Sequence, residues 1–377
     1  MMKRKVYDVI VVGGGAAGIG VAITLRDAGV DNFLVLERHT VGSSFAAWPD
    51  ETRFITPSFT TNSVGMLDLN SIAIGTSPAF SIKVEHPTGE DYARYIKMVA
   101  VQGELPVQEK TDVLRVSKLG EEFVIDTDSE TLRARHVIWA AGEFQYPSLS
   151  EFTGSDLCRH TAMIDSYEGL EGDDFVIIGG FESGIDAAYH LATRGCKVRV
   201  FDCNCPWEEP TSDPSSALST FTLERMRDPR FSENVKLYPN TLVHSVTRSG
   251  RTHEVSTLDI ATMDERRFRT AVPPIMAGGF AGSHKLVMDL FEEREDGFPL
   301  LNEDDESTIV PGLHLCGPAV RHDGHIFCFI FKYRMRFAVV AKKIATSLGL
   351  PAPLLDEYRN WGMYLDDLSC CGEECTC

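Results

Sequence analysis

The clearest chemical pattern in the sequence is a glycine-rich turn near the N-terminus. The segment Gly13-Gly-Gly-Ala-Ala-Gly18 follows an apolar run and opens a stretch typical of a helix. In such a turn the first glycine permits a tight bend, the second lets the backbone approach a pyrophosphate, and the third lets the helix pack on the strand. Glu37 ends the next apolar run, where a carboxylate can accept hydrogen bonds from ribose hydroxyls. We predict a dinucleotide site that includes Gly13, Gly15, Ala17, Gly18, Glu37 and Arg38.

A second turn of the same kind appears later in the chain, with one defect. The segment Gly179-Gly-Phe-Glu-Ser-Gly184 places Phe181 where the second glycine is expected, and a side chain there would crowd a pyrophosphate. Asp202 ends the following apolar run, where a carboxylate favours NADH over NADPH. Two interpretations stay open: a nicotinamide site that prefers NADH or binds it in a shifted pose, and a retained scaffold that no longer binds NAD(P)H well. The predicted contacts are Gly179, Ser183, Gly184 and Asp202.

Cysteine is the third residue type that could do chemistry. The chain has ten cysteines, and four of them crowd its last eight residues. Three interpretations are open for this tail: a redox shuttle that exchanges electrons through a disulfide, capture of a soft metal or metalloid by thiolates, and no catalytic role. We take the redox role as the leading one and predict no resident metal site. The predicted catalytic thiols are Cys370, Cys371, Cys375 and Cys377.

Both glycine turns need a strand before them and a helix after them. Apolar runs and helical periodicity predict a strand over 6–12, a helix over 16–28 and a strand over 33–37. The same strand–helix–strand pattern restarts at 174–178, which makes it an internal repeat. The other predicted elements are a helix near 89–101, a hairpin over 112–117 and 121–127, strands at 136–140, 197–202, 235–247, 254–261 and 312–317, and helices over 183–194 and 325–347.

This order of elements predicts an α/β protein with two Rossmann-like three-layer domains, the second inserted in the first. The first domain is expected to be discontinuous, over 1–150 and 275–377, with a cysteine-rich tail from about 365. The inserted NAD(P)H-type domain is expected over 151–274.

Composition narrows the possible partners. The 377-residue chain is 43% apolar and carries a formal net charge of −19, which argues against nucleic acid as a partner. It contains no apolar run of 18 residues, so no membrane span is expected. The apolar run near the N-terminus leads directly into glycines without a cleavage site, so we predict a β-strand rather than a signal peptide, and a cytoplasmic protein.

The repeat carries a family resemblance. Residues 177–202, IIGGFESGIDAAYHLATRGCKVRVFD, resemble the nicotinamide domain of flavin-containing monooxygenase-like proteins and of bacillithiol-disulfide reductases in the thioredoxin-reductase-like group. This two-dinucleotide layout implies FAD at the first turn and NADH or NADPH at the second. It also implies a homodimer and adds Val113, Gly142, Gly317 and Ile326 to the expected cofactor contacts, with Ile326 at a helix start that faces the flavin.

The sequence departs from the family pattern in two places. The last FAD-binding segment of these enzymes usually ends in Gly-Asp, whereas here it reads Gly317-Pro318. Thioredoxin reductases place a CxxC just before the second turn, and glutathione-reductase-like enzymes place two cysteines after the FAD acid. Here the first region holds only Cys158 and residues 38–60 hold none, so neither standard flavin-facing disulfide is present.

A polar segment beyond Gly317 could supply acid–base groups. His322, Asp323 and His325 lie together, and they could serve a flavin site or cap the helix that follows. We predict His325 as a catalytic group.

Together these patterns predict an FAD-dependent oxidoreductase, NAD(P)H-linked, that acts on a thiol, disulfide or other small sulfur-related substrate. The cysteine tail would be an auxiliary redox group. Two alternatives stay open: a flavin-dependent monooxygenase of a small nucleophile, and a flavoprotein sensor that binds a metal or metalloid.

Overall fold

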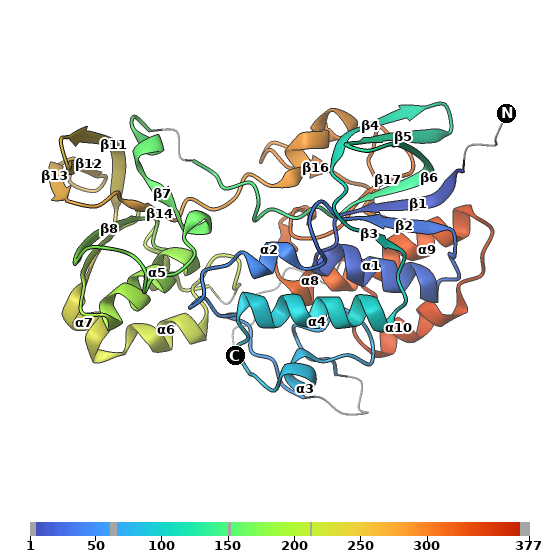
Figure 1. The fold of residues 1–377 in the computed structure, drawn as a ribbon, viewed down its shortest axis with the longest axis horizontal. Helices are drawn as coiled ribbons and strands as arrows, with labels where there is room; N and C mark the ends of the chain where they lie inside the picture. The colour runs from blue at the N-terminus through green and yellow to red at the C-terminus, as the bar shows by residue number, and fades with distance from the viewer. Residues whose placement is uncertain (1–4, 61–65, 150–151, 212, 370–377) are drawn as a thin grey trace. The chain divides into compact units, whose positions relative to one another are not determined.

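Two β-sheets, one mixed and one parallel, each with helices packed on it, make up the framework of the protein (Figure 1). The structure is a computed structural model that describes residues 5–60, 66–149, 152–211 and 213–369. These residues form two units. The first comprises the described parts of 5–46, 57–145 and 282–369, and the second those of 47–56 and 146–281.

The first unit is built on a sheet in the order β3-β2-β1-β6-β5-β4, with β17 also paired to β6. Strand β1 pairs in parallel with β2 and β6, with Val9 opposite both Phe33 and His136. The strands are β1 (Tyr7–Val12), β2 (Phe33–Leu36), β3 (Val107–Gln108), β4 (Val113–Leu119), β5 (Glu122–Thr127), β6 (Thr131–Trp139) and β17 (Leu313–Leu315). Small two-stranded pairs are formed by β15 (Glu292–Glu293) with β16 (Pro299–Leu300), and by β18 (Arg321–His322) with β19 (His325–Ile326).

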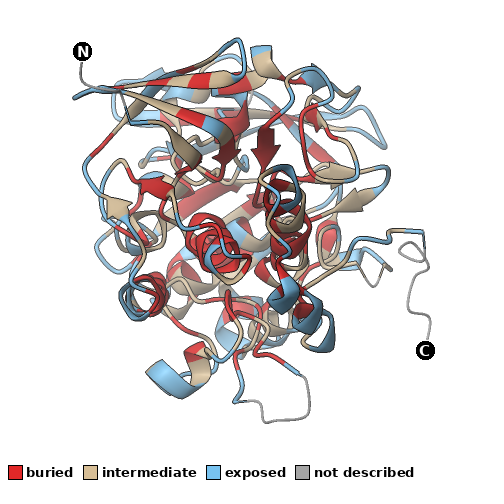
Figure 2. Ribbon diagram, turned by 90° about the vertical axis from the view of Figure 1, so that its right-hand side faces the viewer, coloured by how far each residue is buried: buried red, intermediate tan, exposed pale blue. Residues whose placement is uncertain are grey.

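Helices α1 and α9 of this unit pack closely on each other because α1 carries a glycine at the contact. A Cβ at Gly20 of α1 would lie 2.3 Å from Cε2 of Phe337 in α9, so only glycine allows this approach. Figure 2 shows that buried residues gather in the central strands and helices and that exposed residues lie mainly in the outer loops. The helices of this unit are α1 (Ala16–Asp27), α2 (Ser43–Ala46), α3 (Pro78–Ile82), α4 (Gly89–Gln102), α8 (Ile330–Tyr333), α9 (Phe337–Ser347) and α10 (Glu357–Asn360).

The second unit repeats the parallel arrangement and adds an antiparallel layer. Its parallel sheet has the order β10-β9-β8-β14-β7, and its antiparallel sheet has the order β11-β12-β13. The strands are β7 (Arg159–His160), β8 (Asp174–Ile178), β9 (Lys197–Phe201), β10 (Val235–Tyr238), β11 (Thr241–Ser249), β12 (Thr252–Asp259), β13 (Glu265–Thr270) and β14 (Ile275–Met276). The helices are α5 (Glu182–Thr193), α6 (Thr220–Met226) and α7 (Pro229–Asn234).

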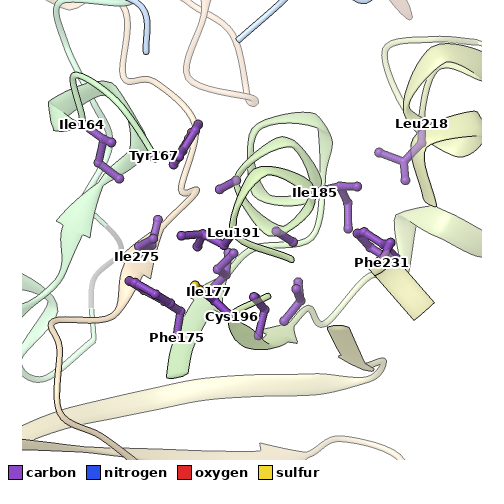
Figure 3. Packing of buried hydrophobic residues seen from close by; sticks show 14 residues of the cluster. Ile164, Tyr167, Phe175, Ile177, Ile185, Leu191, Cys196, Leu218, Phe231 and Ile275 are labelled. Carbon is purple, nitrogen blue, oxygen red and sulfur yellow. The ribbon is translucent and has the colours of Figure 1, made fainter. Parts of the chain in front are cut away.

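Alternation along β8 divides the core of this unit. Phe175 and Ile177 join a cluster with the buried face of α5, which Figure 3 shows from close by. Val176 points to the opposite face and packs with residues of β11 and β12. The parallel sheet therefore lies between a helical layer and an antiparallel layer. The predicted α/β class with two Rossmann-like units is confirmed.

The unit boundaries differ from the predicted domain boundaries. Residues 47–56, expected in the first domain, belong to the second unit, which continues to Ala281 rather than to 274. Side-chain hydrogen bonds hold this segment. The Glu51 carboxylate accepts from the Ser166 hydroxyl at 2.5 Å and from the Tyr167 N–H at 2.9 Å, and Thr52 donates to Asp186 at 2.7 Å.

The helix predicted over 325–347 starts later than expected. Residues 321–326 form the β18–β19 hairpin, in which Asp323 has a left-handed φ of 48°. The helical segment begins at Ile330 and continues through a 3₁₀ turn at Arg334–Arg336 into α9. The Asp323-Gly324 pair is a hairpin signal, and it outweighs the apolar periodicity of the residues that follow.

A buried ion pair between Arg336 and Asp305 lies in the first unit and contacts this hairpin through His322. Arg336 is 1% exposed and donates from Nη2 to Asp305 Oδ1 at 2.7 Å and from Nε to Oδ2 at 3.1 Å. Asp305 is fully buried and also lies 2.5 Å from His322 Nε2. Arg336 further donates from Nη1 to the Leu365 carbonyl at 2.5 Å, which ties the C-terminal segment to the same cluster.

Replacing Arg336 with methionine should lower the free energy of unfolding of the first unit by about 3–5 kcal/mol, because Asp305 would stay buried without its partner. Urea unfolding followed by circular dichroism measures the loss. The exposed Arg359–Asp366 pair provides the control: Arg359→Met should cost less than about 1 kcal/mol. A loss for Arg336→Met as small as that of the control would contradict the expected role of the buried pair.

Candidate functional site

The first glycine turn joins β1 to α1 and cannot be built without glycine at two positions. Gly13 has a φ of 111°, and a Cβ on it would lie 2.4 Å from the Ala140 carbonyl oxygen. A Cβ at Gly18 would lie 1.8 Å from the Gly13 carbonyl oxygen. The tight turn and the close helix–strand contact expected from the sequence are therefore both present.

The space in front of this turn is open. Gly15 is the N-cap residue of α1, with φ −85° and ψ −166°, and it makes no side-chain hydrogen bond to the first turn of the helix. A Cβ at Gly15 would meet nothing within 4 Å. Backbone N–H groups at a helix start together with the helix dipole form a binding site for a phosphate anion. Ala17 is buried in the same turn and lies opposite Gly317, where an added Cβ would be 3.2 Å from the Ala17 Cβ.

Glu37 is held beside the turn by the backbone. Its Oε2 accepts from the Gly14 N–H at 2.7 Å, and its Oε1 accepts from the His39 N–H at 2.8 Å and the Ser43 hydroxyl at 3.2 Å. The carboxylate is 6% exposed, and these bonds fix its orientation. A carboxylate has about four lone-pair sites, so it can still accept a bond from a ribose hydroxyl. Arg38, the next residue, donates to Gln145.

The other expected FAD contacts lie at the ends of strands in the first unit. Val113 begins β4, and Gly142 follows β6 with a φ of 67° and open space around it. The Gly142 carbonyl accepts from the Ser283 N–H at 2.9 Å. Gly317 follows β17 with a φ of 111°. The expected helix start at Ile326 is wrong, because Ile326 lies in β19 and the helical segment begins at Ile330.

The β18–β19 hairpin determines which histidine has a carboxylate partner. His325 pairs with His322 across β18 and β19, and both are partly buried. His322, rather than His325, has the Asp305 carboxylate as its partner. Sequence spacing did not reveal this, because Asp305 lies in an acidic loop that reads as surface. The catalytic role of His325 stays a prediction.

The predicted catalytic thiols Cys370, Cys371, Cys375 and Cys377 lie outside the described residues. Among the cysteines that the structure describes, several have a thiol whose pKa is raised. Burial raises the pKa of Cys158 to about 12, with Asp156 adding to the shift, and burial raises the pKa of Cys316 well above its usual value. Over the described ranges, no group of three or more His, Cys, Asp or Glu residues could hold a metal ion.

The second glycine turn reproduces the geometry of the first. A Cβ at Gly179 would lie 2.4 Å from the Ala277 carbonyl oxygen, and one at Gly184 would lie 2.0 Å from the Gly179 carbonyl oxygen. The Gly180 N–H donates to Asp202 Oδ2 at 2.6 Å, as the Gly14 N–H donates to Glu37. Ser183 is exposed in the first turn of α5.

The two turns differ in what surrounds them. Phe181 takes the place of Gly15, and the Trp207 ring lies against Gly180, where an added Cβ would be 2.3 Å from Trp207 Cζ3. The residues of this second turn therefore do not fit a nicotinamide dinucleotide in the way that the first turn fits FAD. Sequence reasoning found Phe181 but missed Trp207, because no spacing rule relates a residue in the loop after β9 to the glycine turn.

A family model described as pyridine nucleotide-disulphide oxidoreductase matches residues 10–317, and the chain belongs to this family. It is an FAD-dependent oxidoreductase. Members of the family use FAD and a nicotinamide dinucleotide as cofactors.

Curated relatives agree with this assignment. The bacilliredoxin reductase Bdr of Bacillus subtilis is 23% identical over 338 residues, which cover 89% of this chain and 97% of that protein. The uncharacterized oxidoreductase CzcO of Bacillus velezensis is 28% identical over 204 residues. That second match covers 52% of this chain and spans only 55% of the relative.

Solved structures show the same fold at low sequence identity. The bacillithiol disulfide reductase Bdr (YpdA) from Staphylococcus aureus has a TM-score of 0.71 at 21% identity, covering 92% of this chain and 99% of that chain. A flavin-containing monooxygenase from Stenotrophomonas maltophilia has a TM-score of 0.72 at 18% identity. This match covers 92% of this chain and 100% of that chain. In the described part of the chain, no helix combines the length and the apolar character that crossing a membrane requires.

The first turn fits FAD on three counts: the open space at Gly15, the helix start without a side-chain cap, and the fixed Glu37 carboxylate. In this arrangement the backbone of the turn would hold the diphosphate, and Glu37 would accept from the ribose. FAD bound there supplies a flavin that carries an electron pair.

Replacing Gly15 with phenylalanine should weaken FAD binding by about 100-fold, because the ring would fill the space in front of the turn. The fold should persist, since the backbone of Gly15 is extended and its surroundings are open. The flavin-to-protein absorbance ratio after purification and the Kd of FAD for the apoprotein measure the effect.

The matched control is Gly169→Phe, which adds the same ring at an exposed glycine in the second unit. This variant should keep its full flavin content. A Gly15→Phe variant that purifies with as much FAD as the control would show that the diphosphate does not lie at this turn.

Proposed function

We propose that this FAD-dependent oxidoreductase reduces a disulfide or another small sulfur-containing substrate, with the C-terminal cysteines as an auxiliary redox group. The family match over residues 10–317, which spans both glycine turns, is the observation that carries the proposal. The similarity to the bacilliredoxin reductase Bdr of Bacillus subtilis, which extends over 89% of this chain, also supports it.

The cysteine pattern of this chain supports the role given to the tail. Neither of the usual flavin-facing cysteine pairs is present in the sequence, and the four tail cysteines are enough for two dithiol pairs at a time. A dithiol reduces a disulfide by exchange: the two tail thiols form a disulfide, and the substrate disulfide is released as two thiols. The upward pKa shifts of Cys158 and Cys316 argue against these two as the reactive thiolates.

The proposal also covers the electron donor, the compartment, the oligomeric state and the kind of substrate. NADH or NADPH is the electron donor. The protein acts in the cytoplasm as a homodimer, on a small-molecule or protein disulfide rather than on nucleic acid, in keeping with its net charge of −19.

Replacing all four tail cysteines with serine should lower disulfide turnover by about 100-fold or more, because a hydroxyl cannot take part in thiol–disulfide exchange. The enzyme is photoreduced under anaerobic conditions, and bacillithiol disulfide or glutathione disulfide is then added. Reoxidation of the flavin and release of thiols are followed together. The FAD content of the variant should equal that of the wild type.

The control for this experiment is Cys203→Ser with Cys205→Ser, which removes two cysteines from the loop after β9. Turnover of this variant should stay within about two-fold of the wild type. Disulfide reduction that persists in the four-serine variant would show that the tail cysteines are not needed for the reaction. No disulfide reduction by the photoreduced wild type would overturn the reductase function.

A second candidate function is oxygenation of a small nucleophile, and it is favoured by the structural match to a flavin-containing monooxygenase at a TM-score of 0.72. An enzyme of this kind consumes O₂ in step with its substrate. Oxygen uptake by the reduced enzyme that does not change on addition of a thiol or amine substrate would exclude it.

A further inference from the structure

The two glycine turns have nearly the same backbone dihedral angles. The space beside the first turn is open, whereas aromatic side chains lie at the second. Gly15 has φ −85° and ψ −166°, and Phe181 has φ −81° and ψ −170°. A side chain at either position therefore leaves the turn in the same direction. A Cβ at Gly15 would meet nothing within 4 Å, so the direction that the Phe181 side chain takes is the one that is open in the first turn.

A second aromatic residue covers the neighbouring glycine. A Cβ at Gly180 would lie 2.3 Å from Trp207 Cζ3, whereas one at Gly14 would lie no closer than 3.0 Å to any atom outside its neighbours in the chain. The Asp202 carboxylate holds the loop that carries Trp207, since its Oδ1 accepts from the Asn204 N–H at 2.7 Å and from the Cys205 N–H at 3.1 Å. The loop after β9 is thereby folded back onto the turn.

Both aromatic side chains are part of the hydrophobic packing of the second unit. Phe181 and Trp207 are partly buried and pack against the cluster shown in Figure 3, which includes Ile185 and Leu218. Leu218 precedes α6, so this cluster joins the loop after β9, the start of α5 and the start of α6. Moving either aromatic ring away from the turn costs free energy, because apolar surface is returned to water.

Helix α6 is also tied to the first turn of α5 by hydrogen bonds. Glu182 Oε1 accepts from the Ser219 N–H at 2.5 Å, and Oε2 accepts from the Thr222 hydroxyl at 2.5 Å. The N-cap residue of α5, Phe181, makes no side-chain hydrogen bond to the first turn of its helix, and the same holds for Gly15 in α1. Glu182 therefore fixes the start of α6 beside α5, and Phe181 and Trp207 are the side chains that distinguish the second turn from the first.

We propose that Phe181 and Trp207 form an aromatic plug over the second glycine turn, and that the diphosphate of NADH or NADPH must displace this plug in order to lie across the turn. The plug is then the feature that sets the nucleotide affinity of the enzyme. The apparent affinity equals the intrinsic affinity multiplied by the fraction of molecules in which the turn is free. The choice of dinucleotide rests on the proposed function, whereas the plug itself rests on the geometry of the second unit.

The test measures the Kd of NAD⁺ and NADP⁺ for the FAD-loaded, oxidised enzyme by isothermal titration calorimetry. These oxidised nucleotides cannot reduce the flavin, so binding is observed without turnover. Phe181→Gly restores the glycine pattern of the first turn and should lower the Kd of at least one nucleotide by about 10-fold or more. Trp207→Ala should lower this Kd by about 3-fold or more. The double variant should lower the Kd more than either single variant does.

Phe181→Leu is the matched control, since it keeps an apolar side chain over the turn and should leave the Kd within about two-fold of the wild type. Circular dichroism and the melting temperature show whether each variant is folded, and Trp207→Ala tests the plug even if Phe181→Gly is unstable. The proposal is overturned if the folded Phe181→Gly and Trp207→Ala variants bind no more tightly than the wild type. A wild-type Kd below about 10 μM would also overturn it.

These outcomes are separate from a failure of the proposed function. Disulfide reduction by the photoreduced enzyme needs no nucleotide, so it reports on the reductase function alone. The calorimetric titration needs no disulfide, so it reports on the plug alone.

Discussion

The structure depends on one close contact that occurs twice, in which the third glycine of each turn lies against the carbonyl oxygen of the first. An added Cβ would approach that oxygen to 1.8 Å at Gly18 and to 2.0 Å at Gly184. The contact sets the helix directly after the strand and orients its N-terminus at the carboxyl edge of the sheet. It therefore creates the position at which a phosphate can be bound, whether or not that position is free.

The two units show that the same turn can be open or closed. The first keeps glycine at position 15 and leaves the start of α1 without a side-chain cap. The second keeps the first and third glycines and the acid at Asp202, but it has Phe181 in place of the second glycine and the Trp207 ring against Gly180. The scaffold is thus determined by backbone contacts, and access to it is determined by side chains from later parts of the chain.

The first unit has a further organising feature in the buried Asp305–Arg336 pair. Arg336 contacts the Asp305 carboxylate and the Leu365 carbonyl, and Asp305 contacts His322 in the β18–β19 hairpin. The last described segment of the chain is thereby connected to the hairpin that follows Gly317. Because both charges of the pair are out of water, removing one partner leaves the other without compensation.

The sequence by itself determined the repeated strand–helix–strand units, the glycines and the acids of both turns, and the defect at Phe181. These features depend on residues close together in the chain, where periodicity and steric rules apply directly. Two features were decided only by the tertiary structure: the place of residues 47–56 in the second unit, and the Trp207 contact with Gly180. Each depends on packing or hydrogen bonding between distant segments, such as Glu51 with Ser166, and no local pattern encodes which distant partner a segment meets.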